Sequence, residues 1–386
     1  TAIGDDVAYW LNSAMRGILL ADYSFDKYHS DKKDSPELNL GILTGVDSAS
    51  FKKEEQYSHM MASAVALARD LVNEPANVMT PSALADAAKE VCEKQNIKCT
   101  ILEREDCESL GMNAFLAVAR GSKQAPKLIV MEYNGRVTDE EKIALIGKGI
   151  CFDAGGYNLK PSVSMKGMHG DMGGAAAVIA AMGAIAQAKL GINVTAVIPA
   201  CENMISSKAM KPGDIIASMN GKYIEVVNPD AEGRMALADA ITYAIRECGA
   251  TAVIDVATLT GACEVALGSR YTGVFSNSDD LVAKLVQASI LAGENIWRMP
   301  MGDDEYKDLN ASSGADIANC GTQCGAIAAA RFLNEFVERK PWIHMDIAGT
   351  SDSDADTEIY SKGGTGVSAM TLYEFVKLME KPYKSY

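Results

Sequence analysis

Basic residues are in short supply in this sequence. Its 386 residues include 36 Lys and Arg against 51 Asp and Glu, which gives a net charge of −15 at pH 7. Nucleic acids and anionic membranes are bound mainly through lysine and arginine, so we expect neither as a partner. Apolar residues make up 48% of the chain. That share is enough for a substantial core, so we expect an ordered globular protein.

Long apolar runs and histidine are scarce as well. The longest apolar stretch, from Ala175 to Ala188, is interrupted by Gly183 and Gln187. It is shorter than the roughly 18 residues that a membrane-spanning helix needs, so we expect a buried helix there. The sequence has four histidines, which leaves few candidates for histidine metal sites or Ser/His/Asp catalysis. Carboxylates and lysines therefore become the main candidates for catalytic or metal-binding residues.

Nine cysteines are scattered along the chain, an odd number that does not indicate a disulfide scaffold. A reducing compartment is expected, and we predict a cytoplasmic protein. Cys320 and Cys324 have no second ligand pair at metal-finger spacing, so we interpret them as two loop thiols. The chain begins with Thr1 and shows no signal peptide. Organelle targeting by a segment upstream of Thr1 stays open as an alternative.

Short β-branched runs alternate with helix-length segments through most of the chain. The predicted strands are 97–102, 127–133, 143–147, 192–199 and 251–257. The predicted helices are 7–21, 54–72, 81–93, 174–189, 235–247, 281–291 and 326–338. This alternation predicts an α/β fold with a mostly parallel central sheet flanked by helices. In such a sheet, ligands bind beyond the carboxyl ends of the strands.

The first segment with candidate catalytic or metal-binding residues follows a predicted strand and runs from Ile146 to Ala176. It contains Lys148, Asp153, Lys160 and Asp171 within 24 residues, among several glycines that permit close backbone approach. Asp171 precedes a predicted helix, where the helix dipole favours a carboxylate. The structural alternative is a helix-capping aspartate with two surface lysines.

The second segment is Asn228-Pro-Asp-Ala-Glu-Gly-Arg234. If its backbone is extended, Asp230, Glu232 and Arg234 point to one side, because residues two apart share a face. They then form either a salt-bridge ladder or two metal ligands beside an anion clamp. Taken with Asp153 and Asp171, the two segments supply four carboxylates and almost no histidine. That set is typical of a site for two divalent cations, which also relieve the repulsion between the carboxylates.

At these residues the sequence resembles the leucyl aminopeptidase family, the M17 metallopeptidases or cytosol aminopeptidases. The resemblance runs from about Glu54 to the C-terminus. It includes 73–81, 201–204, 211–214, 257–262 and 344–349 as well as the two segments above. It implies a metallo-aminopeptidase, a hydrolase that releases leucine or another apolar first residue from peptides with a free N-terminus. A catalytically silent family member with a structural or binding role is the alternative, and a carboxylate-rich phosphatase or nuclease is a third hypothesis.

The resemblance also implies roles for the site residues. Asp153 and Glu232 would bridge two metal ions, Asp230 would complete one ion's ligands, and Lys148 and Asp171 would complete the other's. The ions would be zinc or manganese, with magnesium or cobalt as further options. Lys148 would then be neutral, with its pKa driven far down by the ion. Lys160 would polarise the scissile carbonyl, and Arg234 would hold a bicarbonate that accepts a proton from the attacking water.

Further expectations from the resemblance concern the substrate pocket, the assembly and the domains. The pocket for the first side chain would be formed by Met168, Thr258, Leu259, Gly261 and Ala348. The family assembles as a homo-hexamer with active sites that face an interior cavity. We expect residues 1–50 to be the remnant of an N-terminal domain. Residues 51–386 would form the catalytic domain, including a linker helix at about 54–72.

Overall fold

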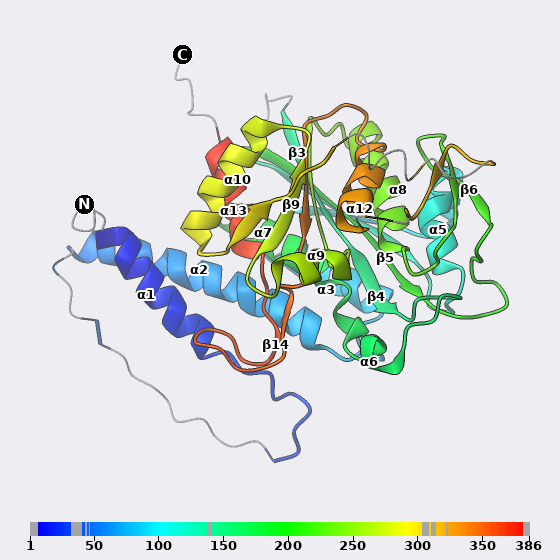
Figure 1. The fold of residues 1–386 in the computed structure, drawn as a ribbon. Coiled ribbons are helices and arrows are strands. Elements are labelled where there is room, and N and C mark those ends of the chain that lie inside the picture. Colours follow the sequence, from blue (N-terminus) through cyan, green and yellow to red (C-terminus); the bar gives the residue numbers. More distant parts are fainter. Residues whose placement is uncertain are drawn as a thin grey trace.

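The computed structural model describes residues 7–31, 41, 42, 45, 47–136, 141–302, 309, 314–321, 323 and 325–380. A large sheet lies between two layers of helices (Figure 1). The strands follow one another across the sheet in the order β1-β2-β5-β3-β8-β12-β9-β10, with β4 paired to β5. In that order they span Lys98–Leu102, Lys127–Asn134, Asn193–Asn203, Lys142–Gly147, Ala252–Ala257, Trp342–Asp346, Thr272–Ser276 and Ile296–Arg298, and β4 spans Gly149–Asp153.

The centre of the sheet is parallel. Strands β5, β3, β8 and β12 all run in one direction, and β4 runs parallel to β5. Antiparallel pairs occur toward the edges, where β2 joins β5 and β9 joins β12. The predicted mostly parallel α/β fold is therefore confirmed. The carboxyl ends of β3, β4, β8 and β12 point to the same edge of the sheet, and the candidate site residues lie there.

Two helical layers cover the two faces of the sheet. One layer contains α2 (Ser48–Asn73), α3 (Pro81–Gln95), α7 (Gly173–Gln187), α10 (Asp279–Ala292) and α13 (Ala369–Met379). The other contains α4 (Arg104–Ser109), α5 (Asn113–Ala119), α8 (Gly233–Arg246) and α12 (Gly325–Asn334). The N-terminal helix α1 (Val7–Ala21) lies along the outer side of α2 (Figure 1). Alternate residues of each central strand point into opposite layers, so each strand is apolar on both faces.

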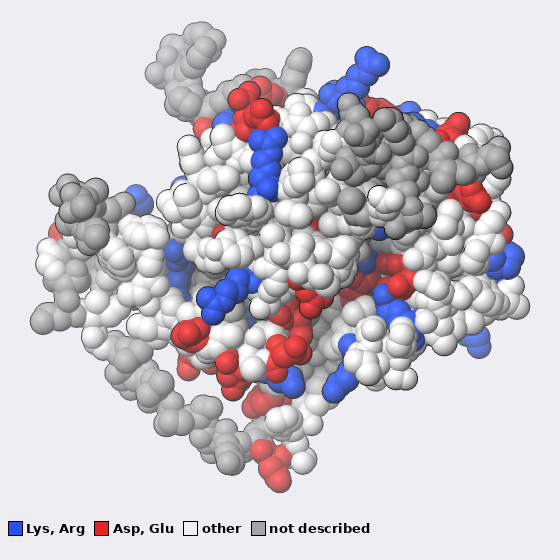
Figure 2. All heavy atoms as spheres, in the orientation of Figure 1, with Lys and Arg blue, Asp and Glu red and all other residues white. Residues whose placement is uncertain are grey.

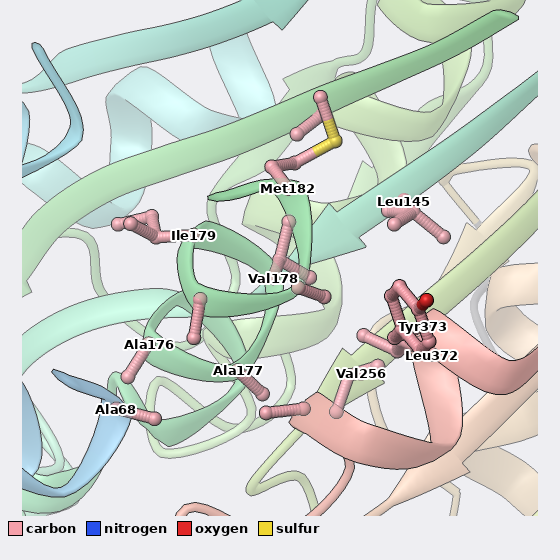
Figure 3. Packing of buried hydrophobic residues seen from close by; sticks show 14 of the residues in the cluster. Ala68, Leu145, Ala176, Ala177, Val178, Ile179, Met182, Val256, Leu372 and Tyr373 are labelled. Carbon is pink, nitrogen blue, oxygen red and sulfur yellow. The ribbon is translucent and has the colours of Figure 1, made fainter. Parts of the chain in front are cut away.

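Helix α7 is surrounded by other elements because its residues are small and apolar. Ala176, Ala177, Val178 and Ile179 are all buried, and they pack among β3, α2 and α13 (Figure 3). Gly174 permits the closest approach to the sheet, since a Cβ atom there would lie 2.0 Å from the carbonyl oxygen of Val256. The first turn of α7 is thus held directly against the end of β8.

Short elements connect the strand ends. They include α6 (Ser162–Met165), the 3₁₀ helix η1 (Met168–Gly170) and α9 (Gly261–Leu267). A small sheet joins β6 (Ile215–Ala217), β7 (Tyr223–Glu225) and β11 (Ile317–Ala318). A hairpin pairs β13 (Asp352–Ser353) with β14 (Gly363–Gly364). None of the helices in the described part of the chain is long and apolar enough to cross a membrane.

Most predicted elements are confirmed within a few residues, and α1 matches its predicted range. The largest differences in length are in three elements. Helix α2 begins at Ser48 and not at Glu54, β5 ends at Asn203 and not at Pro199, and α12 ends at Asn334 and not at Glu338. After Asn334 the N–H groups of Glu335 and Phe336 bond to the carbonyl oxygens of Phe332 and Leu333, three residues back, so the α-helical pattern stops before Glu338 and Arg339, whose φ values are positive at 48° and 62°. In the large sheet, strands β4, β9, β10 and β12 were not among the predicted strands. Cys324 and parts of residues 1–50 lie outside the described residues.

Candidate metal centre

Lys148 occupies the middle of the site. It is the single residue between the end of β3 and the start of β4. Its side chain is 3% exposed, and its Nζ lies 2.7 Å from Asp171 Oδ1 and 3.0 Å from Glu232 Oε1. The same ammonium donates to the carbonyl oxygen of Thr258 at 2.9 Å. Burial lowers the pKa of Lys148, but attraction from the surrounding carboxylates outweighs burial and raises this pKa above its ordinary value. A positive charge at this position is therefore strongly favoured.

Three buried carboxylates converge around that ammonium. Asp153, Asp171 and Glu232 each offer one oxygen, and these oxygens lie within 4.8 Å of one another. Asp171 Oδ2 and Glu232 Oε2 are buried and have no hydrogen-bond partner among the described residues. Burial and repulsion from Asp153 raise the pKa of Glu232 to about 8 and that of Asp171 to about 6. Free carboxylate oxygens that face one another are suitable ligands for a divalent cation, so the residues fit a metal ion.

Lys160 and Asp230 extend the cluster toward solvent. Lys160 Nζ lies 2.9 Å from Asp153 Oδ2 and 2.6 Å from Asp230 Oδ1. Asp153 and Glu232 are buried, whereas the side chain of Lys160 is 16% exposed and that of Asp230 is 26% exposed. Four carboxylates and two ammonium groups leave a formal charge of −2 in the cluster, which favours cation binding.

Asp171 does not cap α7, which removes the structural alternative for this residue. The N-cap position of α7 is Met172, and its side chain makes no capping hydrogen bond. Asp171 Oδ1 instead accepts hydrogen bonds from Lys148 Nζ and Thr258 Oγ1, both at 2.7 Å. The carboxylate is therefore directed into the cluster by two neighbours that lie on other elements.

The second motif is a turn followed by a helix, so the predicted extended backbone is wrong. The side chain of Asn228 accepts a hydrogen bond from the Asp230 N–H at 2.8 Å, which bends the chain into a turn. Glu232 has helical backbone angles, and Arg234 lies in the first turn of α8. Asp230 and Glu232 nevertheless both reach the cluster. Their convergence results from the turn and not from alternation along a strand.

Arg234 is buried beside the cluster. Its Nη1 donates to the carbonyl oxygen of Asn319 at 3.0 Å, and its Nε is buried with no partner within the ranges that the structure describes. Burial lowers its pKa from the usual arginine value. A buried guanidinium with a free N–H group is able to hold a small anion.

Two asparagines that hold the motifs in place were not predicted as site residues. Asn203, at the end of β5, donates to Asp153 Oδ1 at 2.8 Å and to the carbonyl oxygen of Pro229 at 3.1 Å, which links the two motifs. Asn319 accepts hydrogen bonds from the N–H groups of Val227 and Asn228. Asn203 lies in a polar patch at a strand end, which is a weak signal. Asn319 has no sequence signal, because its role depends entirely on its spatial neighbours.

Two of the predicted pocket residues are held by one carboxylate. Asp346 ends β12, and its Oδ1 accepts hydrogen bonds from the N–H groups of Leu259 and Ala348, both at 3.2 Å. Thr258 precedes Leu259, and Gly261 is the first residue of α9. Met168 lies half-buried on η1, three residues before Asp171. Met168 belongs to neither of the two apolar clusters that the described residues form.

Figure 2 shows a hollow near the middle of one face of the molecule, where acidic and basic side chains meet. In the same view of the ribbon, this place lies between α9 and β4, near the carboxyl ends of the parallel strands (Figure 1). The predicted location beyond the strand ends therefore agrees with the arrangement of the charged residues.

Comparisons with known proteins agree on one group of relatives. Residues 66–373 match the sequence model of the cytosol aminopeptidase family, catalytic domain. The "Probable cytosol aminopeptidase" of Alkaliphilus oremlandii is 50% identical over 372 residues, which cover 95% of this chain and 74% of that protein. The protein of the same description from Clostridium tetani is 47% identical over 95% of this chain and 77% of its own length. A solved structure, "Bottromycin maturation enzyme BotP in complex with Mn", is similar with a TM-score of 0.90 and 35% identity, covering 97% of this chain and 80% of that one.

Proposed function

The chain belongs to the cytosol aminopeptidase family of metal-dependent peptidases, and on this basis we propose that it is a two-metal aminopeptidase. It hydrolyses the N-terminal peptide bond of peptides, with a preference for leucine or another apolar first residue. The observation that carries this proposal is the buried group Asp153, Asp171 and Glu232. Two of its oxygens have no hydrogen-bond partner in the part of the chain that the structure describes.

Five residues would hold the two ions. Asp153 and Glu232 would bridge them, Asp230 would complete one ion's ligands, and Lys148 and Asp171 would complete the other's. Manganese is supported by the name of the similar BotP structure, and zinc, magnesium or cobalt also suit a carboxylate-rich site with one amine. When bound, such ions lower the pKa of water and polarise a carbonyl oxygen. Lys148 must lose its proton to become a ligand, so metal binding releases a proton there.

Lys160 and Arg234 would act on the substrate side of the cluster. The ammonium of Lys160, held by Asp153 and Asp230, would donate to the scissile carbonyl oxygen and stabilise the negative charge that develops on it. Arg234 would hold a bicarbonate ion as the proton acceptor for the attacking water, a role that its unpartnered Nε supports.

The first residue of the peptide would lie in the pocket formed by Met168, Thr258, Leu259, Gly261 and Ala348. A methionine at its wall suits leucine or methionine side chains. Binding of the free α-amine at the metal centre would restrict cleavage to the first peptide bond. We also propose that residues 51–386 form the catalytic unit, that the chain assembles as a homo-hexamer and that it acts in the cytoplasm, as the description of its relatives suggests.

Hydrolysis of leucine arylamide tests this function. The purified chain with Mn²⁺ or Zn²⁺ should release the arylamine, and a chelator should stop the reaction. Asp230→Ala and Lys148→Ala should each abolish it without unfolding the chain in the presence of metal. If both variants keep wild-type activity, the proposed centre is wrong. A chain that binds the ions in calorimetry but hydrolyses no aminoacyl arylamide would instead be the catalytically silent family member.

A further inference from the structure

Asp346 is a buried carboxylate at the point where two central strands end. It is the last residue of β12 and lies opposite Ala257, the last residue of β8. The N–H of Ile347 bonds to the carbonyl oxygen of Ala257 at 2.8 Å, one step past these strand ends. Asp346 is 1% exposed. Its side chain continues the link between the two segments beyond their backbone ladder.

Hydrogen-bond donors from two segments surround this carboxylate. Its Oδ1 accepts from the N–H groups of Leu259 and Ala348, both at 3.2 Å, and from the Thr260 N–H at 3.4 Å. Its Oδ2 accepts from Thr260 Oγ1 at 2.7 Å. Leu259 and Thr260 follow β8, whereas Ala348 follows β12. One oxygen atom therefore sets the separation of two segments that carry predicted pocket residues.

The hydroxyl group of Thr260 extends this link to α9. Thr260 is the N-cap residue of α9, and its Oγ1 accepts a hydrogen bond from the Cys263 N–H at 3.1 Å. A hydroxyl group can donate one hydrogen bond and accept others, so the same oxygen bonds to Asp346 and to the helix. Gly261, a predicted pocket residue, is the first residue of α9. The start of this helix is thus held against the end of β12.

The segment that Asp346 holds also contacts the metal centre. Thr258 directly precedes Leu259. Its carbonyl oxygen accepts a hydrogen bond from Lys148 Nζ at 2.9 Å, and its Oγ1 donates to Asp171 Oδ1 at 2.7 Å. Lys148 and Asp171 are two of the residues proposed to hold metal. A shift of the segment after β8 therefore moves a hydrogen-bond partner of both.

We propose that Asp346 is a positioning residue that couples the pocket for the first side chain to the metal centre. This inference rests on the proposed function, because it concerns the same site. Hydrogen bonds to a carboxylate are about twice as strong as those to a neutral acceptor. The bonds from Leu259 and Ala348 set the width of the pocket, and the same attachment keeps Thr258 against two metal ligands. Selectivity for the first residue and affinity for metal both depend on this one side chain.

Two variants of Asp346 in the full chain test the coupling. Asp346→Ala removes all of these bonds, whereas Asp346→Asn keeps the size of the side chain and loses its charge. The measurements are kcat/KM for leucine and alanine arylamides and calorimetric titration with Mn²⁺. In Asp346→Ala the ratio of kcat/KM for leucine over alanine should fall by roughly 10-fold or more, because a fitted pocket distinguishes even one methylene group by about that factor. The affinity for Mn²⁺ should fall by roughly 10- to 100-fold, as for other partners of metal ligands. Asp346→Asn should show both losses to a smaller extent, each more than about twofold.

Glu294→Ala is the matched control. Glu294 is also a buried carboxylate, and it accepts hydrogen bonds from the N–H groups of Ser368 and Thr371 and from the Thr371 hydroxyl, at the start of α13. Its loss should leave the selectivity ratio and the affinity for Mn²⁺ within about twofold of wild type, whatever its effect on urea unfolding. If Glu294→Ala loses both properties as Asp346→Ala does, the proposal is overturned, because destabilisation alone then accounts for them.

The two measured properties must change together. A folded Asp346 variant that keeps either the selectivity ratio or the affinity for Mn²⁺ within about twofold of wild type overturns the coupling. If Asp346→Ala does not fold, Asp346→Asn decides by the same criterion. If the wild-type chain binds Mn²⁺ but hydrolyses neither arylamide, the proposed function fails. The Mn²⁺ titrations then still decide whether Asp346 positions the metal centre, and an unchanged affinity in its variants overturns that role.

Discussion

Gly233 determines how closely the first turn of α8 approaches Lys148, and Gly233→Ala tests the proposed metal centre. A Cβ atom at this position would lie 2.4 Å from Lys148 Cε and 2.8 Å from Lys148 Nζ. Carbon atoms that are not bonded to each other prefer about 3.5–4.0 Å, so the end of Lys148 must move by more than about 1 Å. That shift displaces Nζ from Asp171 and Glu232, which now lie at 2.7 and 3.0 Å.

The expected consequence is a large loss of function with little loss of stability. A misplacement of about 1 Å at a reacting centre costs roughly 100-fold in rate, so kcat/KM for leucine arylamide should fall by about that factor. The affinity for Mn²⁺ should fall by roughly 10- to 100-fold, as for other changes that disturb metal ligands. The added methyl group meets the flexible end of a side chain, and alanine favours a helix by up to about 1 kcal/mol over glycine. The free energy of unfolding with chelator should therefore change by less than about 2 kcal/mol.

Two other glycine-to-alanine variants serve as controls. Gly17 lies in α1, and a Cβ atom there meets nothing within 4 Å, so Gly17→Ala should leave activity and metal affinity unchanged and raise stability by up to about 1 kcal/mol. At Gly174 the added atom would lie 2.0 Å from the backbone carbonyl oxygen of Val256, so this variant should lose stability and activity together. The measurements are arylamide hydrolysis, calorimetric titration with Mn²⁺ and urea unfolding. A folded Gly233→Ala chain whose activity and metal affinity stay within twofold of wild type would refute the reasoning.

Three further predictions concern charge. Protons compete with metal for Glu232 and Asp171, whose pKa values burial raises to about 8 and about 6. The affinity for Mn²⁺ should therefore rise between pH 5 and pH 9 with proton release, measured by calorimetry in two buffers, and a flat profile would contradict this. Lys148→Met removes the charge that balances these carboxylates, so in chelator it should lower the free energy of unfolding at pH 8 by roughly 3–5 kcal/mol. Urea unfolding should show part of this loss recovered at pH 5, where the carboxylates take up protons, and an equal loss at both pH values would argue against the pairing. Burial raises the pKa of Glu294 from 4.5 to about 7, so the folded state binds the extra proton and wild-type stability falls as the pH rises through this interval. Glu294→Gln should remove up to about 3 kcal/mol of that fall in urea unfolding at pH 5 and pH 8, and identical pH profiles for the two proteins would exclude the effect.

Local patterns in the sequence predicted many of the helices and strands. The Thr80-Pro81 pair predicts the start of α3, and in the structure the Thr80 side chain caps this helix at the Ala83 N–H. Helix α8 begins at Gly233, within two residues of its predicted start at Met235. The start of a helix depends on a residue and its near neighbours in the chain, so the local sequence is enough to predict it. The predicted end of α12 was wrong because the helix closes with i→i−3 hydrogen bonds at Glu335 and Phe336, where the sequence has no glycine or other local stop signal.

The sequence by itself determined the kinds of groups in the candidate site, since four carboxylates and two lysines occur in two motifs that follow strands. It could not determine how these groups meet. Lys148 contacts Asp171 and Glu232, which are 23 and 84 positions away, because the parallel strands end at one edge of the sheet and Gly233 leaves room for the lysine. Asn203 and Asn319 gained their roles in the same way, through hydrogen bonds to residues distant in the sequence. The chemistry of a side chain is local, but its desolvation, its partners and therefore its pKa are set by neighbours that only the folded chain supplies.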